Sequence, residues 1–273
     1  MFAMNILQQY TVKQLDTATK LLKEYAVEKD PETLHQLRVA LKKIKAVLHY
    51  LRSETSWNSK KSKQLLQLLF RAAGTVREMH LRSNWLQQNN YSALAAAAQL
   101  QQKIKEEESV FVDRAAEWEG ILVKLQTKLE KLTSDTKHEQ LLKYIPALKE
   151  QVGQFSFATS NEGWHEYRKQ VKQLLYAQHW LTEKEKLQLL PVNESKRLDT
   201  LQEKIGNWHD MIDMFDWLQE QQFYLSKDKL LHSEYNRAIK KLQQQQLKAE
   251  QQLQTEFAEK KTALTQRKSR EKK

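Results

Sequence analysis

The sequence predicts an all-α protein, and three features of its composition and pattern lead to that prediction. Its 273 residues include only 5 glycines and 3 prolines, the residues that interrupt helices most strongly. Leucine, glutamine, lysine, glutamate and alanine, which favour helices, fill the long stretches between them. Apolar residues recur along these stretches at intervals of three and four, the period of an amphipathic helix. Hydrophobic residues make up 40% of the chain, which is enough for a packed core and argues against disorder.

The predicted helices of the first half follow one another with short polar breaks. Asp30 and Pro31 are a strong start signal, because aspartate suits the N-cap and proline suits the first helical position. In chain order, the helical stretches run over residues 4–27, from Pro31 to a polar break at 53–59, over 63–85 through Gly74, over 91–133 as one or two helices, and from a second polar gap at 133–136 to about Val152.

The segment GQFSFATSNEG, residues 153–163, is the predicted boundary between two halves, residues 1–153 and 154–273. It contains two of the five glycines, several small polar residues, and Thr159 and Glu162 at the spacing of a capping box. The helices expected beyond it end near Leu181, span Asn193–Gln222 after a break around Pro191, and span Lys227–Leu264, followed by a frayed basic tail, QRKSREKK.

Composition also limits the classes of function. The chain has no cysteine, which excludes disulfides, thiolate chemistry and cysteine-ligated zinc. We find neither a signal peptide nor an apolar run of about 18 residues, so a soluble cytoplasmic protein is expected. The formal net charge of +11 suits a polyanionic partner, but charge alone does not distinguish such a partner from simple solubility.

A basic helical segment occurs twice in the chain. LHQLRVALKKIKAVLHYL, residues 34–51, aligns with WHEYRKQVKQLLYAQHWL, residues 164–181, always 130 positions apart. Each copy has a downstream glycine, 39 or 41 residues after its first histidine, with a basic residue and an acid three and four positions later. This register indicates a duplicated helical unit. The matched residues are His35 and His165, Arg38 and Arg168, Lys42 and Lys172, His49 and His179, Leu51 and Leu181, Gly74 and Gly206, Arg77 and His209, and Glu78 and Asp210.

On a helix, the matched basic residues form one stripe about 80° wide and four turns long, separate from the apolar face. Lys45 belongs to this stripe in the first copy, and Tyr176 lies beside it in the second. Like charges four residues apart, such as Arg38 and Lys42, cost a few tenths of a kcal/mol unless an anion neutralises them. That cost is modest, so the repeated register carries the argument for a polyanion-binding surface.

The motif H-x-x-R-V-x-x-[RK]-[RK]-x-[RK], its weaker second copy, and the echoes G-x-x-R-[DE] and G-x-x-x-D resemble the CHAD domain, the conserved histidine α-helical domain, over residues 5–265. The resemblance implies two pseudo-symmetric four-helix halves around a central basic cavity that binds inorganic polyphosphate. It implies phosphate contacts from His35, Arg38, Lys42, Lys45, His165, Arg168 and Lys172, with Lys43, Arg77, Lys169 and Tyr176 as further candidates. Glu78 stands where aspartate is commoner, and lysine replaces arginine at positions 42, 43 and 45. Gln173 and Leu175 occupy positions where bases are frequent, so the second half is expected to contribute less.

The preferred function is therefore non-catalytic polyphosphate binding, with no cofactor, no metal and no catalytic residue. We expect His35 and His165 to bond phosphate oxygens, the glycines to be close packing points, and Glu78 and Asp210 to orient nearby bases. The tryptophans are expected to lie mostly in the core. Oligomeric state is not predicted, and association with polyphosphate granules would fit this function.

Two alternatives belong to other classes. A nucleic-acid-binding protein would have the same charge, but it should place aromatic residues among the exposed bases, and the stripes carry only Tyr176. An enzyme that processes polyphosphate or triphosphates is the other alternative, since CHAD domains are often joined to a CYTH triphosphatase domain. The E-x-E-x-K motif of that domain does not occur in this sequence.

Overall fold

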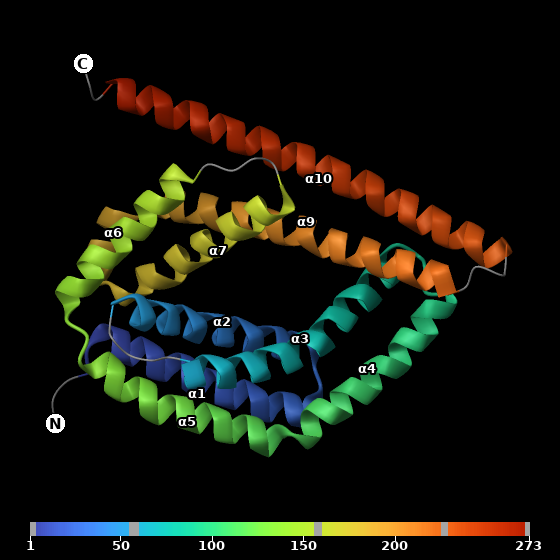
Figure 1. Cartoon of the computed structure of the whole chain (residues 1–273), viewed down its shortest axis with the longest axis horizontal. Coiled ribbons are helices and arrows are strands. Elements are labelled where there is room, and N and C mark those ends of the chain that lie inside the picture. The colour runs from blue at the N-terminus through green and yellow to red at the C-terminus, as the bar shows by residue number, and fades with distance from the viewer. Residues whose placement is uncertain (1–3, 55–59, 156–159, 225–228, 271–273) are drawn as a thin grey trace. The chain divides into compact units, whose positions relative to one another are not determined.

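The computed structural model describes residues 4–54, 60–155, 160–224 and 229–270, and over these it is all-α, as predicted. The helices are α1 (Ile6–Glu28), α2 (Pro31–Glu54), α3 (Lys60–Gln88), α4 (Ala95–Asp113), α5 (Ala115–Ser134), α6 (His138–Gln154), α7 (Asn161–Ala177), the 3-10 helix η1 (Gln178–Trp180), α8 (Glu183–Leu189), α9 (Val192–Tyr224) and α10 (Lys229–Arg270) (Figure 1).

The chain forms two compact units, and neither is a single continuous stretch. The first comprises residues 1–151 and 173–192, and the second comprises residues 152–172 and 193–273. The division falls inside α7, between Lys172 and Gln173, so this helix contributes to both units. The basic residues at the start of α7 therefore belong to the second unit, whereas those of α2 belong to the first.

In the first unit, α1 packs against α2 and α5, α2 packs against α3, and α3 packs against α4 and α5 (Figure 1). The apolar face predicted for α2 is confirmed, since Leu37, Leu41 and Ile44 are fully buried. A cluster of rings adds to this core around Trp180, whose ring lies 5.6 Å from that of Tyr50 between centroids. Burying such large side chains is a major source of stability.

In the second unit, α9 and α10 run antiparallel, and α7 packs with them. Gln222 Nε2, near the end of α9, donates to Asn236 Oδ1 of α10 at 2.9 Å, and Lys204 of α9 pairs with Glu256 of α10 at 2.9 Å further along. The rings of Trp164 and Tyr167 on α7 contact Phe257 of α10 edge to face. These contacts hold α10 against α7 and α9 of its own unit.

Most predicted helix limits agree with the structure to within a few residues. The Asp30 carboxylate accepts from the Thr33 amide at 2.7 Å, which confirms the predicted N-cap of α2. Residues 91–133 contain two helices, which meet at Arg114. Thr159 lies outside the described residues, and Ser160 Oγ instead accepts from the Gly163 amide at 3.1 Å at the start of α7.

Two features of the helices differ from what the sequence indicated. Residues 183–189 form the short helix α8, which begins with a capping box of Thr182 and Glu185 that sequence inspection overlooked. The last helix continues to Arg270 instead of fraying from residue 266, because lysine, arginine and glutamine all favour helices and no glycine or proline interrupts them. Within the described residues, none of the helices combines the length and hydrophobicity that crossing a bilayer requires.

The predicted core position of the tryptophans is largely confirmed. Trp85 is only half-buried, and Trp57 lies outside the described residues. The buried ones are Trp118, Trp164, Trp180, Trp208 and Trp217.

Candidate functional site

The predicted site residues lie on three helices. On α2, His35, Arg38, Lys42 and Lys43 are half-buried and Lys45 is exposed; on α3, Arg77 is half-buried; on α7, His165, Arg168, Lys172 and Tyr176 are half-buried and Lys169 is exposed. Each unit therefore holds one arginine-centred group of basic side chains.

In the first unit, the guanidinium of Arg38 is fixed against α3. Arg38 Nη1 donates to the carbonyl oxygen of Phe70 at 2.8 Å, and its Cζ lies 4.3 Å from the centroid of the Phe70 ring. Gly74, one turn after Phe70, is buried, and a Cβ placed on it would lie 2.6 Å from Arg38 Nη1. The side chain thus occupies the space that a larger residue at position 74 would fill.

In the second unit, Arg168 makes the corresponding contacts with α9. Arg168 Nε donates to the carbonyl oxygen of Gln202 at 3.0 Å. Gly206 follows Gln202 by one turn and is buried, and a Cβ on it would meet Arg168 Nη2 and lie 2.9 Å from Cζ. In both units, the arginine bonds the carbonyl four residues before the glycine. The aligned register of the sequence therefore corresponds to the same contacts.

The histidines of the second unit lie close together. The rings of His165 and His209 are 5.4 Å apart between centroids. His209 Nδ1 lies 3.2 Å from Asp213, and this hydrogen bond raises the pKa of His209. Partial burial, followed by the nearby Lys169 and by His209 itself, lowers the pKa of His165, so its neutral form is favoured. His209, Asp210 and Asp213 also place possible metal-ligand atoms within 4.8 Å of one another, although both acids are exposed.

The environment of Lys172 strongly lowers the pKa of its ammonium group. Burial, and then the charge of Arg168, lower the pKa of Lys172 to about 8, while Asp199 and Asp210 oppose the change. The ammonium group of Lys172 therefore lies near Arg168, and repulsion between the two positive charges disfavours its protonated form. The negative charges of Asp199 and Asp210 offset part of this repulsion.

Three of the lesser candidates lie apart from these groups or have other partners. Lys43 is half-buried near Lys13 of α1, and burial followed by this like charge lowers the pKa of Lys43. Lys169 forms an exposed ion pair with Glu166 at 2.6 Å, an interaction of small energetic value. Arg77 Nη1 donates to the carbonyl oxygen of Pro31 at 3.4 Å.

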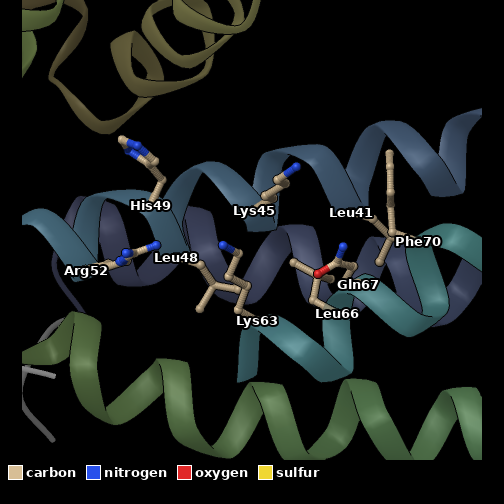
Figure 2. Close-up of a pocket in the computed structure, with 9 residues that line it drawn as sticks. All are labelled: Leu41, Lys45, Leu48, His49, Arg52, Lys63, Leu66, Gln67 and Phe70. Atoms are coloured by element: carbon tan, nitrogen blue, oxygen red, sulfur yellow. The ribbon is translucent and has the colours of Figure 1, made fainter. Parts of the chain in front are cut away.

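A pocket of about 300 Å³ lies between α2 and α3 in the first unit, and Figure 2 shows its lining. Lys45, His49, Arg52 and Lys63 supply its basic groups, and among the lining residues that the structure describes there is no acid. Leu41, Leu48, Leu66, Gln67 and Phe70 complete the lining. The basic stripe of α2 thus continues into a pocket.

The sequence analysis placed Lys45 and His49 on the basic stripe, and it missed the other two basic residues of this pocket. Arg52 follows His49 by three residues, so helical spacing could have found it at the end of the stripe. Lys63 comes from α3, and only the packing of α3 on α2 brings it to the same pocket.

These features define a class of protein: an all-α chain in which one basic helical motif occurs twice and each copy rests its arginine on a neighbouring helix beside a glycine. The family model of the CHAD domain matches residues 9–219, and the chain belongs to this family. The crystal structure of the CHAD domain from the plant Ricinus communis is similar, with a TM-score of 0.71 and 16% identity over 94% of this chain and 92% of that chain. At this identity, the likeness concerns the fold. A comparison with curated proteins gives no match.

Proposed function

We propose that this protein binds inorganic polyphosphate, without catalysis, through the basic groups of α2 and α7. The observation that supports this most is the repeated placement of Arg38 and Arg168, each held by a backbone carbonyl. An arginine fixed in this way loses little conformational freedom when it binds an anion, and the planar guanidinium geometry suits phosphate oxygens.

The shape of the basic surface also suits a linear chain of phosphates. The stripe on α2 extends for about 20 Å, the rise of roughly four helical turns. From Lys45 and His49 it continues into the pocket with Arg52 and Lys63. Successive phosphates of a polyphosphate chain each carry a negative charge, so one chain can neutralise several of these bases at once.

In the basic group of the first unit, the ring of Phe70 is not open for base stacking. The ring of Phe70 has Arg38 and Lys45 over it, at 4.3 and 5.8 Å from its centroid, so cations cover its face. Proteins that bind single-stranded nucleic acid stack bases on such faces. This arrangement favours a phosphate chain over a nucleic acid.

A competition measurement tests the proposal. The protein is titrated with long-chain polyphosphate and with single-stranded DNA of matched charge, at low and at physiological salt, and phosphate release is followed with Mg²⁺ present. We expect tighter binding of polyphosphate, binding that persists at physiological salt although weakened by counterion release, and no phosphate release. Equal affinity for both polymers, lost together as salt rises, would refute specific polyphosphate binding. Release of phosphate would refute the non-catalytic role.

The lowered pKa of Lys172 predicts a pH-dependent affinity. As pH rises through about 8, the ammonium group of Lys172 loses its proton and the site loses a positive charge. A bound polyanion favours the charged form, so affinity should fall between about pH 7.5 and 9.5, with proton uptake on binding. Lys172→Met should flatten this part of the profile. Lys196→Met, which removes an exposed lysine of α9, should leave the slope in place, and an unchanged slope in Lys172→Met would contradict the assignment.

The pocket predicts a contribution from Arg52 and Lys63. Alanine at either position removes one cation from a site whose described lining contains no acid, so affinity should fall about threefold to tenfold. The dependence of the affinity on salt should also become shallower by about one counterion. Lys60 is an exposed lysine of α3 outside the pocket lining, so Lys60→Ala is the matched control. An equal loss of affinity in that variant would mean that only the net charge matters.

A further inference from the structure

We infer that Gly74 and Gly206 are positioning residues for the two arginines, a role that rests on the proposed function. Each glycine leaves open the space in which the guanidinium of Arg38 or Arg168 is seated. The prediction is specific, because alanine at these positions should weaken polyphosphate binding without weakening the fold.

The first part of the argument is steric. An added Cβ on Gly74 would lie 2.6 Å from Arg38 Nη1, well inside van der Waals contact. On Gly206, it would lie 2.9 Å from Cζ and 3.1 Å from Nε of Arg168, besides its contact with Nη2. In each case, the atoms it meets belong to the arginine side chain. Alanine would therefore push the guanidinium away from the carbonyl that holds it.

The second part is that backbone conformation does not require glycine at either position. Both residues lie inside long helices, and among the described residues no glycine has a positive φ. Glycine inside a helix is less favourable than alanine. The two glycines therefore weaken α3 and α9 locally. The space that each leaves for the guanidinium group explains why glycine stands at these positions.

Two other helical glycines give matched controls. Gly120 of α5 lies in the first unit and Gly153 of α6 in the second, and a Cβ on either meets nothing within 4 Å. Alanine at Gly120, in the interior of its helix, changes helix propensity in the same way as at Gly74 or Gly206, and alanine at Gly153, one residue before the end of its helix, changes it less. Neither alanine meets an arginine side chain. A difference in polyphosphate affinity between the two pairs of variants therefore reports the effect of the glycine on the position of the arginine.

The first experiment measures thermal stability and polyphosphate affinity for Gly74→Ala, Gly206→Ala, Gly120→Ala and Gly153→Ala. All four should keep or raise the Tm, because a flexible guanidinium can move aside. Gly74→Ala and Gly206→Ala should each lose about tenfold in affinity, the scale of one charge-assisted hydrogen bond, whereas the controls should bind as the unchanged protein does. Unchanged affinity in both test variants would overturn the inference.

A double-mutant cycle then identifies the arginine as the cause. In an Arg38→Ala background, adding Gly74→Ala should cause no further loss, because the side chain that the glycine accommodates is gone. A further tenfold loss in that background would mean that the glycine acts on packing or backbone, and it would overturn the positioning role. Arg168→Ala with Gly206→Ala repeats the test in the second unit.

A measurement without ligand separates this inference from the proposed function. Arg168 Nε–H donates to the Gln202 carbonyl, so its ¹⁵N resonance should be resolved and its hydrogen exchange slowed. Gly206→Ala should shift that resonance and speed its exchange, while Gly153→Ala should not. If the Arg168 Nε resonance is unchanged in Gly206→Ala, the positioning role of Gly206 is refuted, whether or not the protein binds polyphosphate. If the resonance shifts but the protein binds no polyphosphate, the positioning role is supported and only the proposed function is refuted.

Discussion

Replacing Arg38 and Arg168 together by alanine should lower the affinity for long-chain polyphosphate by at least about a hundredfold. Hydrogen bonds to charged groups contribute about 1.5–3 kcal/mol each, and a backbone carbonyl holds each of the two guanidinium groups in place. The loss is to be measured by titration at physiological salt, where weak surface attraction is screened. Each single variant should lose about tenfold or more.

The control for this experiment keeps the same net charge. Arg114→Ala with Arg237→Ala removes one arginine from each unit, outside the basic groups of α2 and α7. Arg114 pairs with Glu117, and Arg237 is exposed on α10. We expect this variant to retain most of the affinity. Equal losses in the two double variants would show that polyphosphate responds to overall charge, and the assigned sites would then be wrong.

Arginine and lysine have different parts in such a site. A lysine is a point charge on a flexible stem, so it adds attraction without direction. The guanidinium groups of Arg38 and Arg168 are instead held by a backbone carbonyl, which limits the directions in which they can bond an anion. Affinity should therefore depend on the number of lysines, whereas the preference for phosphate over other anions should depend on the two arginines.

The duplicated register predicted which residues correspond but not which atoms meet. The sequence placed Gly74 and Gly206 at similar distances after the first histidines and suggested close packing points. In the structure, the close neighbour is the aligned arginine itself. Spacing along a chain reveals that two segments repeat, but the contact depends on the crossing of two helices, which local periodicity does not encode.

Other features lay beyond local pattern for the same reason. Lys63 joins the pocket because α3 packs on α2, and the first unit includes residues 173–192, far along the chain from its other parts. The position of residues 173–192 depends on long-range contacts, such as the bond from Gln173 Nε2 to the Ala46 carbonyl at 3.0 Å. From the sequence, Gln173 was notable only because it occupies a position where basic residues are frequent. In the structure, this side chain joins the C-terminal end of α7 to α2.

Trp180 is the other residue whose loss should have a large effect, this time on stability. It is fully buried, and its ring lies 6.1 Å from that of Tyr10, 5.6 Å from that of Tyr50 and 6.4 Å from that of Tyr144. These tyrosines belong to α1, α2 and α6, so the side chain of Trp180 packs residues 173–192 against three helices of the first unit. Trp180→Ala should therefore lower the free energy of unfolding by about 3–5 kcal/mol in denaturant titrations.

Trp85 provides the comparison that separates this anchoring from the general cost of removing a tryptophan. It is half-buried on α3 and stacks on Tyr91, with ring centroids 5.7 Å apart, so it joins neighbouring parts of the chain. Trp85→Ala should cost about 1–2 kcal/mol, because partly exposed rings bury less apolar area. In Trp180→Ala, amide exchange should also accelerate first in α8 and the end of α7, which lose their hold on the unit. Similar stabilities for the two variants, with exchange unchanged in α8, would show that other contacts hold residues 173–192 in place.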